Sequence, residues 1–168
     1  MNTQKNLINF ATFINDIASE AFDELGSGFK EDTYQKALAI SLRKNKVKYL
    51  KELNLEIFFK NESLGIFRID FLIPKQKVKN FNLSKPVIIE TKCASNIKND
   101  ARLQLKNYLI SLPYNSSEIL SQVTEGIVLN WRNNLAVDDE ALEGVDLEMF
   151  ALRKNKFKLI YQLPKVTL

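Results

Sequence analysis

Apolar residues near the start of the chain follow helical spacing. This spacing predicts a helix over residues 3–25, which ends at Gly26 because glycine tolerates the left-handed conformation of a helix C-terminus. A second helix is predicted over 30–46, where the apolar residues again lie along one side. The apolar positions of the two helices are Leu7, Phe10, Phe13, Ile14, Ile17, Ala21 and Leu25, followed by Tyr34, Ala37, Leu38 and Leu42.

Beyond residue 50 the pattern changes to that of strands. Apolar and polar residues alternate over 53–59 and apolar residues return over 66–73, so a turn at 61–65 would join two antiparallel strands. The continuous apolar run over 87–89 predicts a strand buried on both faces, at the centre of the sheet. The intervening residues 74–86, rich in lysine and asparagine, match neither pattern.

The second half of the chain adds a helix and more strands. Helical spacing over 98–112 predicts a third helix, and residues 126–131 form an apolar strand. Two further strands, 149–153 and 157–163, are predicted to form a hairpin. With its elements in this order, the chain 1–168 is expected to fold as one mixed α/β domain, with helices packed against a central sheet.

The composition narrows the chemistry. The chain has no histidine, and Cys93 is its single cysteine, so histidine-based catalysis, a thiolate zinc site and an internal disulfide are excluded. Carboxylates, lysine, tyrosine, hydroxyls and a hard metal ion remain. The net charge of +4 is compatible with a polyanionic partner and equally with an ordinary solvated surface. The sequence shows no membrane span or signal peptide, so we expect a cytoplasmic protein without a membrane partner.

Three charged residues on the predicted central strands are candidates for catalysis. Asp70 lies within an apolar strand, where a carboxylate is costly unless a metal or cation compensates it. The alternative places it on a solvated face, paired with Arg68. Glu90 and Lys92 are two apart and so share one face of a strand, where they suit metal-assisted hydrolysis. Their alternative is an ordinary ion pair at a strand end.

Two pairs of helical residues add to this set. Glu31 and Tyr34 share a face of the second predicted helix, and Gln104 and Tyr108 share a face of the third. Each pair also has a structural interpretation. Glu31 would be an acidic residue in the first turn that interacts favourably with the helix dipole. Gln104 would lie at the core boundary, and both tyrosines would pack in the core.

Taken in order over about residues 25–131, these motifs resemble the GxxExxY proteins of the PD-(D/E)XK nuclease-like superfamily. The resemblance implies a restriction-endonuclease-like core with the order αβββαβ, in which a four-stranded mixed sheet is flanked by helices. The motifs are Gly28-x-x-Glu31-x-x-Tyr34, the Asp70 strand, Glu90-x-Lys92, Gln104-x-x-x-Tyr108-Leu109 and Gly126-Ile127-Val128-Leu129-Asn130-Trp131.

The resemblance also implies roles for individual residues. Asp70 and Glu90 would bind Mg²⁺ or Mn²⁺, assisted by the backbone carbonyl of Thr91, and oxygen ligands of this kind suit Mg²⁺. Lys92 would position the attacking water or stabilise the phosphate. The remaining residues expected around the site are Glu31 and Gln104, with Tyr34 and Tyr108 as accessory residues.

These roles lead to a functional expectation of a metal-dependent nuclease that acts on DNA in preference to RNA. Lys98, Arg102 and Lys106 share a helical spacing that could follow a phosphate backbone, although a solvated basic face is the alternative. A non-catalytic nucleic-acid-binding or assembly module of the same fold is the second hypothesis.

Several properties stay open at the level of sequence. They include the strandedness of the substrate, endonucleolytic or exonucleolytic cutting, the pathway, and the oligomeric state, for which a homodimer would suit the cutting of both strands. The polar insertion at 75–85 and the C-terminal extension over 135–168 also have no assigned role.

Overall fold

The protein is built on a mixed sheet of six strands in the order β1-β2-β5-β6-β7-β8. A computed structural model describes residues 1–133 and 144–165. Strands β5 and β6 are parallel, and every other neighbouring pair is antiparallel. The strands are β1 (Leu50–Phe59), β2 (Glu62–Ile73), β5 (Val87–Ala94), β6 (Glu125–Arg132), β7 (Gly144–Arg153) and β8 (Lys156–Leu163).

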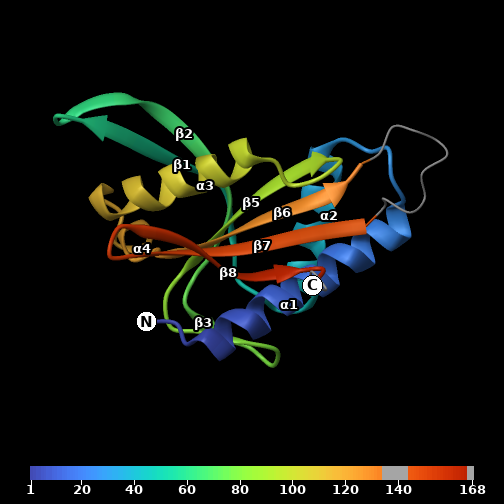
Figure 1. The fold of residues 1–168 in the computed structure, drawn as a ribbon. Coiled ribbons are helices and arrows are strands. Elements are labelled where there is room, and N and C mark those ends of the chain that lie inside the picture. Colours follow the sequence, from blue (N-terminus) through green and yellow to red (C-terminus); the bar gives the residue numbers. More distant parts are fainter. Residues whose placement is uncertain (134–143, 166–168) are drawn as a thin grey trace.

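Helices cover both faces of this sheet (Figure 1). The first two helices pack on one face and the third packs on the other, so the buried side chains form two clusters separated by the sheet. The order α2-β1-β2-β5-α3-β6 is the predicted αβββαβ core, which confirms the predicted fold class. The helices are α1 (Gln4–Leu25), α2 (Glu31–Lys44), α3 (Asn99–Ser111), the 3₁₀ turn η1 (Leu112–Tyr114) and α4 (Glu118–Ser121).

Alternation along the central strand β5 assigns its side chains to the two faces. Val87 and Ile89 pack in the cluster with α1 and α2, whereas Ile88 packs in the cluster with α3. Continuing this alternation directs Glu90 toward α3 and Thr91 toward α2. The consecutive residues at the end of β5 therefore serve opposite faces of the sheet.

The segment that the sequence left unassigned, 74–86, forms a small second sheet. Its strands β3 (Gln76–Lys77) and β4 (Asn82–Leu83) pair antiparallel. Phe81, between them in sequence, is buried against α1, with its ring centroid 4.9 Å from that of Phe10. Two-residue strands are too short to leave an alternating pattern, which explains why the sequence did not reveal them.

One expectation about the sheet is corrected. The turn predicted at 61–65 is a two-residue turn of Lys60 and Asn61, which both adopt positive φ angles. The second of the strands that it joins is therefore longer than predicted, with β1 ending at Phe59 and β2 beginning at Glu62. The expected four-stranded core, β1-β2-β5-β6, is present, and the hairpin predicted in the C-terminal extension forms as β7 and β8, which continue the sheet to six strands. The rest of that extension, 135–143 and 166–168, lies outside the described residues. Within the described part of the chain, no helix is long and apolar enough to cross a membrane.

Close packing between α3 and the sheet makes Gly126 a sensitive position. A Cβ atom there would lie 2.6 Å from Leu105 Cδ1 and 3.0 Å from Ile88 Cγ1. We expect Gly126→Ala to lower the free energy of unfolding by about 1–3 kcal/mol through overpacking. Urea unfolding followed by the fluorescence of Trp131, the single and fully buried tryptophan, measures this change.

The double variant Gly126→Ala/Leu105→Ala is the control for this interpretation. Removing the Leu105 side chain makes room for the added methyl group. The double variant should therefore lose less free energy of unfolding than the sum of the losses of the two single variants. Strictly additive losses, or an Ala variant more stable than the wild type, would contradict overpacking.

Candidate functional site

The site lies where strands β2 and β5 separate. Their ladder has three pairs, the last of which joins Phe71 to Ile89. Past this pair β2 continues with β1 as a hairpin that leaves the sheet, while β5 continues beside β6 (Figure 1). Asp70 on β2 and Glu90 on β5 are the next residues beyond the ladder. The fork between the strands therefore has one carboxylate on each side.

A sharp twist of β2 accompanies this fork. Ile69 and Leu72 both pack in the cluster with α3, although Phe71 between them packs in the other cluster, so the alternation breaks at Asp70. Across the hairpin, Glu52 has a left-handed φ of 58°. Sequence patterning assumes regular alternation and could not have placed Asp70 at such a break.

The Asp70 carboxylate takes the place of a main-chain partner for β5. The Thr91 main-chain N–H and its hydroxyl both donate to Asp70 Oδ2, at 2.8 and 2.9 Å. Arg68, the alternative partner considered for Asp70, instead has its guanidinium 4.0 Å from Glu52. Asp70 is thus held by the strand that carries Glu90 and Lys92.

Helix α2 joins the site through Thr91. Gln35 Nε2 donates to Thr91 Oγ1 at 2.7 Å and to Glu31 Oε1 at 3.1 Å. Thr91 Oγ1 also lies 3.2 Å from Glu31 Oε1, so Glu31 and Asp70 are alternative acceptors for its proton. The sequence reasoning missed Gln35, although its position four residues after Glu31 on one helix face was a usable signal.

Helix α3 contributes a relay of hydrogen bonds that ends at Lys92. Lys92 Nζ donates to Gln104 Oε1 at 2.9 Å and to Glu90 Oε1 at 3.4 Å. Gln104 Nε2 donates to the Tyr108 hydroxyl at 2.8 Å, and that hydroxyl donates to the Arg68 carbonyl at 3.5 Å. The relay fixes which end of the Gln104 amide faces Lys92, and so holds the ammonium group in place.

The electrostatics of the site favour a bound cation. Glu90 is 3% exposed, and its Oε2 is buried with no hydrogen-bond partner among the described residues. Burial raises the pKa of Glu90 to about 8, with a further contribution from the charge of Asp70 and an opposing effect of Lys92. Burial also raises the pKa of Glu31, again with Asp70 adding to the shift. Lys92 alone does not compensate these carboxylates.

The donor set fits a hard divalent ion. The unpartnered oxygen of Glu90 and the nearby carboxylate of Asp70 are the oxygen ligands that Mg²⁺ prefers, with water completing its shell. In the described part of the chain, no three acidic or cysteine side chains converge as a complete metal cage. A main-chain ligand such as the expected Thr91 carbonyl would therefore be needed, and this ligand stays a prediction.

Tyr34 is packed in the core and supports the loop before α2. It is fully buried and stacks on Trp131, with ring centroids 5.4 Å apart. Its hydroxyl donates to the Gly26 carbonyl at 2.6 Å and accepts from the Phe29 N–H at 3.4 Å. These bonds anchor the loop that leads into α2, and so position Glu31 at the start of that helix.

The three basic residues proposed for phosphate binding lie apart from the relay. Arg102 forms a two-pronged ion pair with Glu148 on β7, with N–O distances of 2.6 and 2.7 Å. Lys98 is exposed at the N-terminal end of α3, and Lys106 is half-buried. Their contact with nucleic acid stays a prediction, and Glu148 offsets the charge of Arg102.

The raised pKa of Glu90 predicts how the metal-free protein responds to pH. Below 4.5, the ordinary value, Glu90 is protonated in both states; between 4.5 and about 8 the folded state retains a proton that the unfolded state has lost. The free energy of unfolding should therefore fall as pH rises through this window, by at most about 1.4 kcal/mol per pH unit.

Urea unfolding in EDTA between pH 5 and 8.5 tests this, with Glu90→Gln as the matched control. The uncharged variant should lose this part of the pH dependence and be the more stable protein at pH 8. Parallel curves for the two proteins would show that Glu90 is not the titrating group.

Comparison with known proteins agrees with this geometry. A family model described as the PD-(D/E)XK nuclease superfamily matches residues 8–138. No curated protein and no solved structure gives a significant match. The matched region contains the whole fork, with Asp70, Glu90 and Lys92 around it. The chain belongs to the PD-(D/E)XK nuclease superfamily.

Proposed function

We propose that this protein is a metal-dependent nuclease that hydrolyses phosphodiester bonds, in DNA in preference to RNA. The observation that carries the proposal is the buried Glu90 Oε2 beside Asp70 and Lys92, which has no hydrogen-bond partner in the part of the chain that the structure describes. A buried carboxylate without a partner is costly to the fold, and a cation bound for catalysis gives a reason to retain it. The preference for DNA rests on the resemblance of the ordered motifs.

Each residue would have a definite task. Asp70 and Glu90 would hold Mg²⁺ or Mn²⁺, together with the Thr91 carbonyl. The ion, when bound, supplies a Lewis acid that polarises the phosphate and offsets its negative charge. Lys92 would direct its ammonium protons toward the attacking water or a phosphate oxygen, where they stabilise the charge that develops in the transition state.

The surrounding residues would position this group without touching the reacting atoms. Gln104 and Tyr108 would keep the Lys92 ammonium oriented through the relay from α3. Glu31 would act through the Thr91 hydroxyl, which it shares with Asp70. We also propose membership of the GxxExxY proteins, because Gly28, at φ 99°, lies in the loop that Tyr34 anchors before Glu31.

Cleavage of labelled DNA tests the function directly. Wild-type protein should cut DNA in Mg²⁺ or Mn²⁺ and not in EDTA, whereas Asp70→Ala and Lys92→Ala should each lower the rate by on the order of 100-fold or more. Lys36→Ala is a matched control, because that lysine pairs with Asp32 on the exposed side of α2. RNA of the same sequence should be cut more slowly.

The non-catalytic alternative predicts a different result in the same assay. A wild-type protein that cuts neither DNA nor RNA, yet retains DNA in a salt-sensitive manner, would contradict the nuclease proposal and favour the binding module.

A graded series of variants tests the relay. Gln104→Ala removes the acceptor of Lys92, while Tyr108→Phe removes only the hydroxyl that orients Gln104. We expect kcat to fall least for Tyr108→Phe, further for Gln104→Ala and furthest for Lys92→Ala, with KM changed by less than about threefold. Single-turnover cleavage rates measure this order. A Tyr108→Phe defect as large as that of Lys92→Ala would contradict a purely positioning role.

A further inference from the structure

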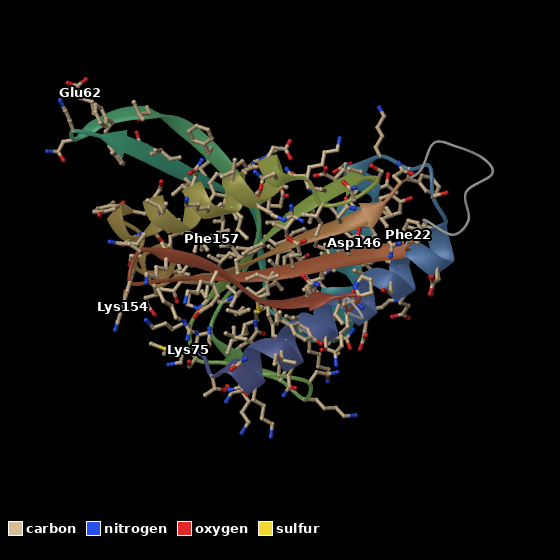
Figure 2. All side chains as sticks on the ribbon, in the orientation of Figure 1. Phe22, Glu62, Lys75, Asp146, Lys154 and Phe157 are labelled. Atoms are coloured by element: carbon tan, nitrogen blue, oxygen red, sulfur yellow. The ribbon has the colours of Figure 1, made fainter. Side chains whose placement is uncertain are left out.

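The hairpin of β1 and β2 exposes an unusual amount of apolar surface. It projects from the body of the protein beyond α3, with Glu62 near its tip (Figure 2). Concentrated apolar exposure of this kind marks a binding surface more often than an inert one. The large apolar side chains exposed on the hairpin are Leu50, Phe58, Phe59, Leu64, Ile66 and Phe67.

A groove separates this hairpin from α3. Its inner part, of about 430 Å³, is lined by Phe67 on the hairpin side and by Gln104 and Tyr108 on the helix side. Its outer part, of about 560 Å³, is lined by Phe58 and Lys60 on the hairpin and by residues around Tyr114 on the other side.

One stripe of helix surface connects the two parts. From one turn of α3 to the next, the lining residues on this side are three or four apart as far as Ser111, so they form a continuous face, and Tyr114 follows in η1. At 1.5 Å per residue, the part of this stripe on α3, from Asp100 to Ser111, is about 16 Å long. The residues of the stripe are Asp100, Leu103, Gln104, Asn107, Ser111 and Tyr114.

The inner end of the groove meets the proposed catalytic residues. Gln104 lines the groove and accepts from Lys92 Nζ at 2.9 Å, while Tyr108 lines the groove and accepts from Gln104. At the outer end, Lys60 supplies positive charge, with its Nζ 5.4 Å from the centre of the Phe59 ring. A strand lying in the groove would therefore run from Lys60 toward Gln104, which contacts Lys92.

We propose that this groove binds a single strand of DNA, with bases stacked on Phe58, Phe67 and Tyr114, and delivers a phosphodiester to Lys92. The proposal rests on the proposed nuclease function, since Lys92 marks the point of cleavage. The three rings are 47%, 44% and 80% exposed, so their faces are open to a ligand. Stacking on aromatic side chains beside a basic group is the means by which proteins hold single strands without reading their sequence.

The features of the groove favour a single strand over other occupants. A duplex keeps its bases stacked on each other, so the three rings would find no base faces. A second copy that packed its own exposed apolar hairpin side chains here would bury Gln104 and Lys60 without offering them polar partners. Asp100 is the acidic group of the groove, and its charge is offset by the Ala101 N–H, which donates to it at 2.8 Å at the start of α3.

Fluorescence anisotropy of a labelled 20-nucleotide oligo-dT, measured in EDTA to prevent cleavage, tests the groove. We expect tighter binding to oligo-dT than to a 20-base-pair duplex, and a loss of about 10-fold or more for Phe67→Ala and for Tyr114→Ala. Lys60→Ala should reduce the slope of log affinity against log salt concentration by about one, because one fewer phosphate is neutralised. Leu159→Ala is the matched control, because Leu159 is equally exposed but lies on β8, and it should bind as the wild type does.

Three results would overturn the proposal. They are unchanged oligo-dT affinity in both aromatic variants, tighter binding to the duplex, and tighter binding to oligo-U, which would assign the groove to RNA. A fourth result would also overturn it, namely sedimentation that shows a dimer lost in Phe67→Ala, which would assign the surface to a second copy.

Binding and cleavage fail independently in these experiments. A wild type that binds oligo-dT through Phe67 but cuts nothing supports the groove and contradicts the nuclease. A wild type that cuts DNA, with Phe67→Ala and Tyr114→Ala cutting at the same rate, supports the nuclease and contradicts the groove.

Discussion

The hydrogen bonds from Thr91 to the Asp70 carboxylate are the contacts on which the rest of the structure depends. In a continued ladder the Thr91 N–H would pair with the main chain of β2; here it donates to a side chain at 2.8 Å. This substitution satisfies β5 while allowing β2 to turn away. The same departure opens the fork between the carboxylates and sends the β1–β2 hairpin out over α3, where it forms one wall of the groove.

The fork is costly to the fold in a way that suits a catalytic site. Glu90 is nearly fully buried, and the charge of Asp70 adds to the effect of burial on its pKa. The two clusters of buried apolar side chains, one on each face of the sheet, stabilise the fold and so offset this cost. Proteins commonly store unfavourable electrostatics at functional sites and compensate for it through packing elsewhere.

Helix α3 connects the chemistry to the surface. Leu105 and Leu109 fix the helix in the core, so Gln104 and Tyr108 on its flank are held rigidly between Lys92 and the groove. Sites supported by packed helices and strands keep their geometry more accurately than sites on loops. The close approach at Gly126 is part of this support, because it allows the helix to lie directly on the parallel strands.

The sequence by itself determined most of the elements and the αβββαβ order, because apolar periodicity is a local property, and side-chain chemistry proposed the candidate site residues. Glu90 and Lys92 were paired correctly, since strand alternation puts residues two apart on one face. Tertiary structure alone decided that Asp70 lies at a break in that alternation, that Gln35 bridges Glu31 to Thr91, and that the extension completes the sheet. Thr91 is 56 residues from Gln35 and 21 from Asp70, so no local pattern records its contacts with them.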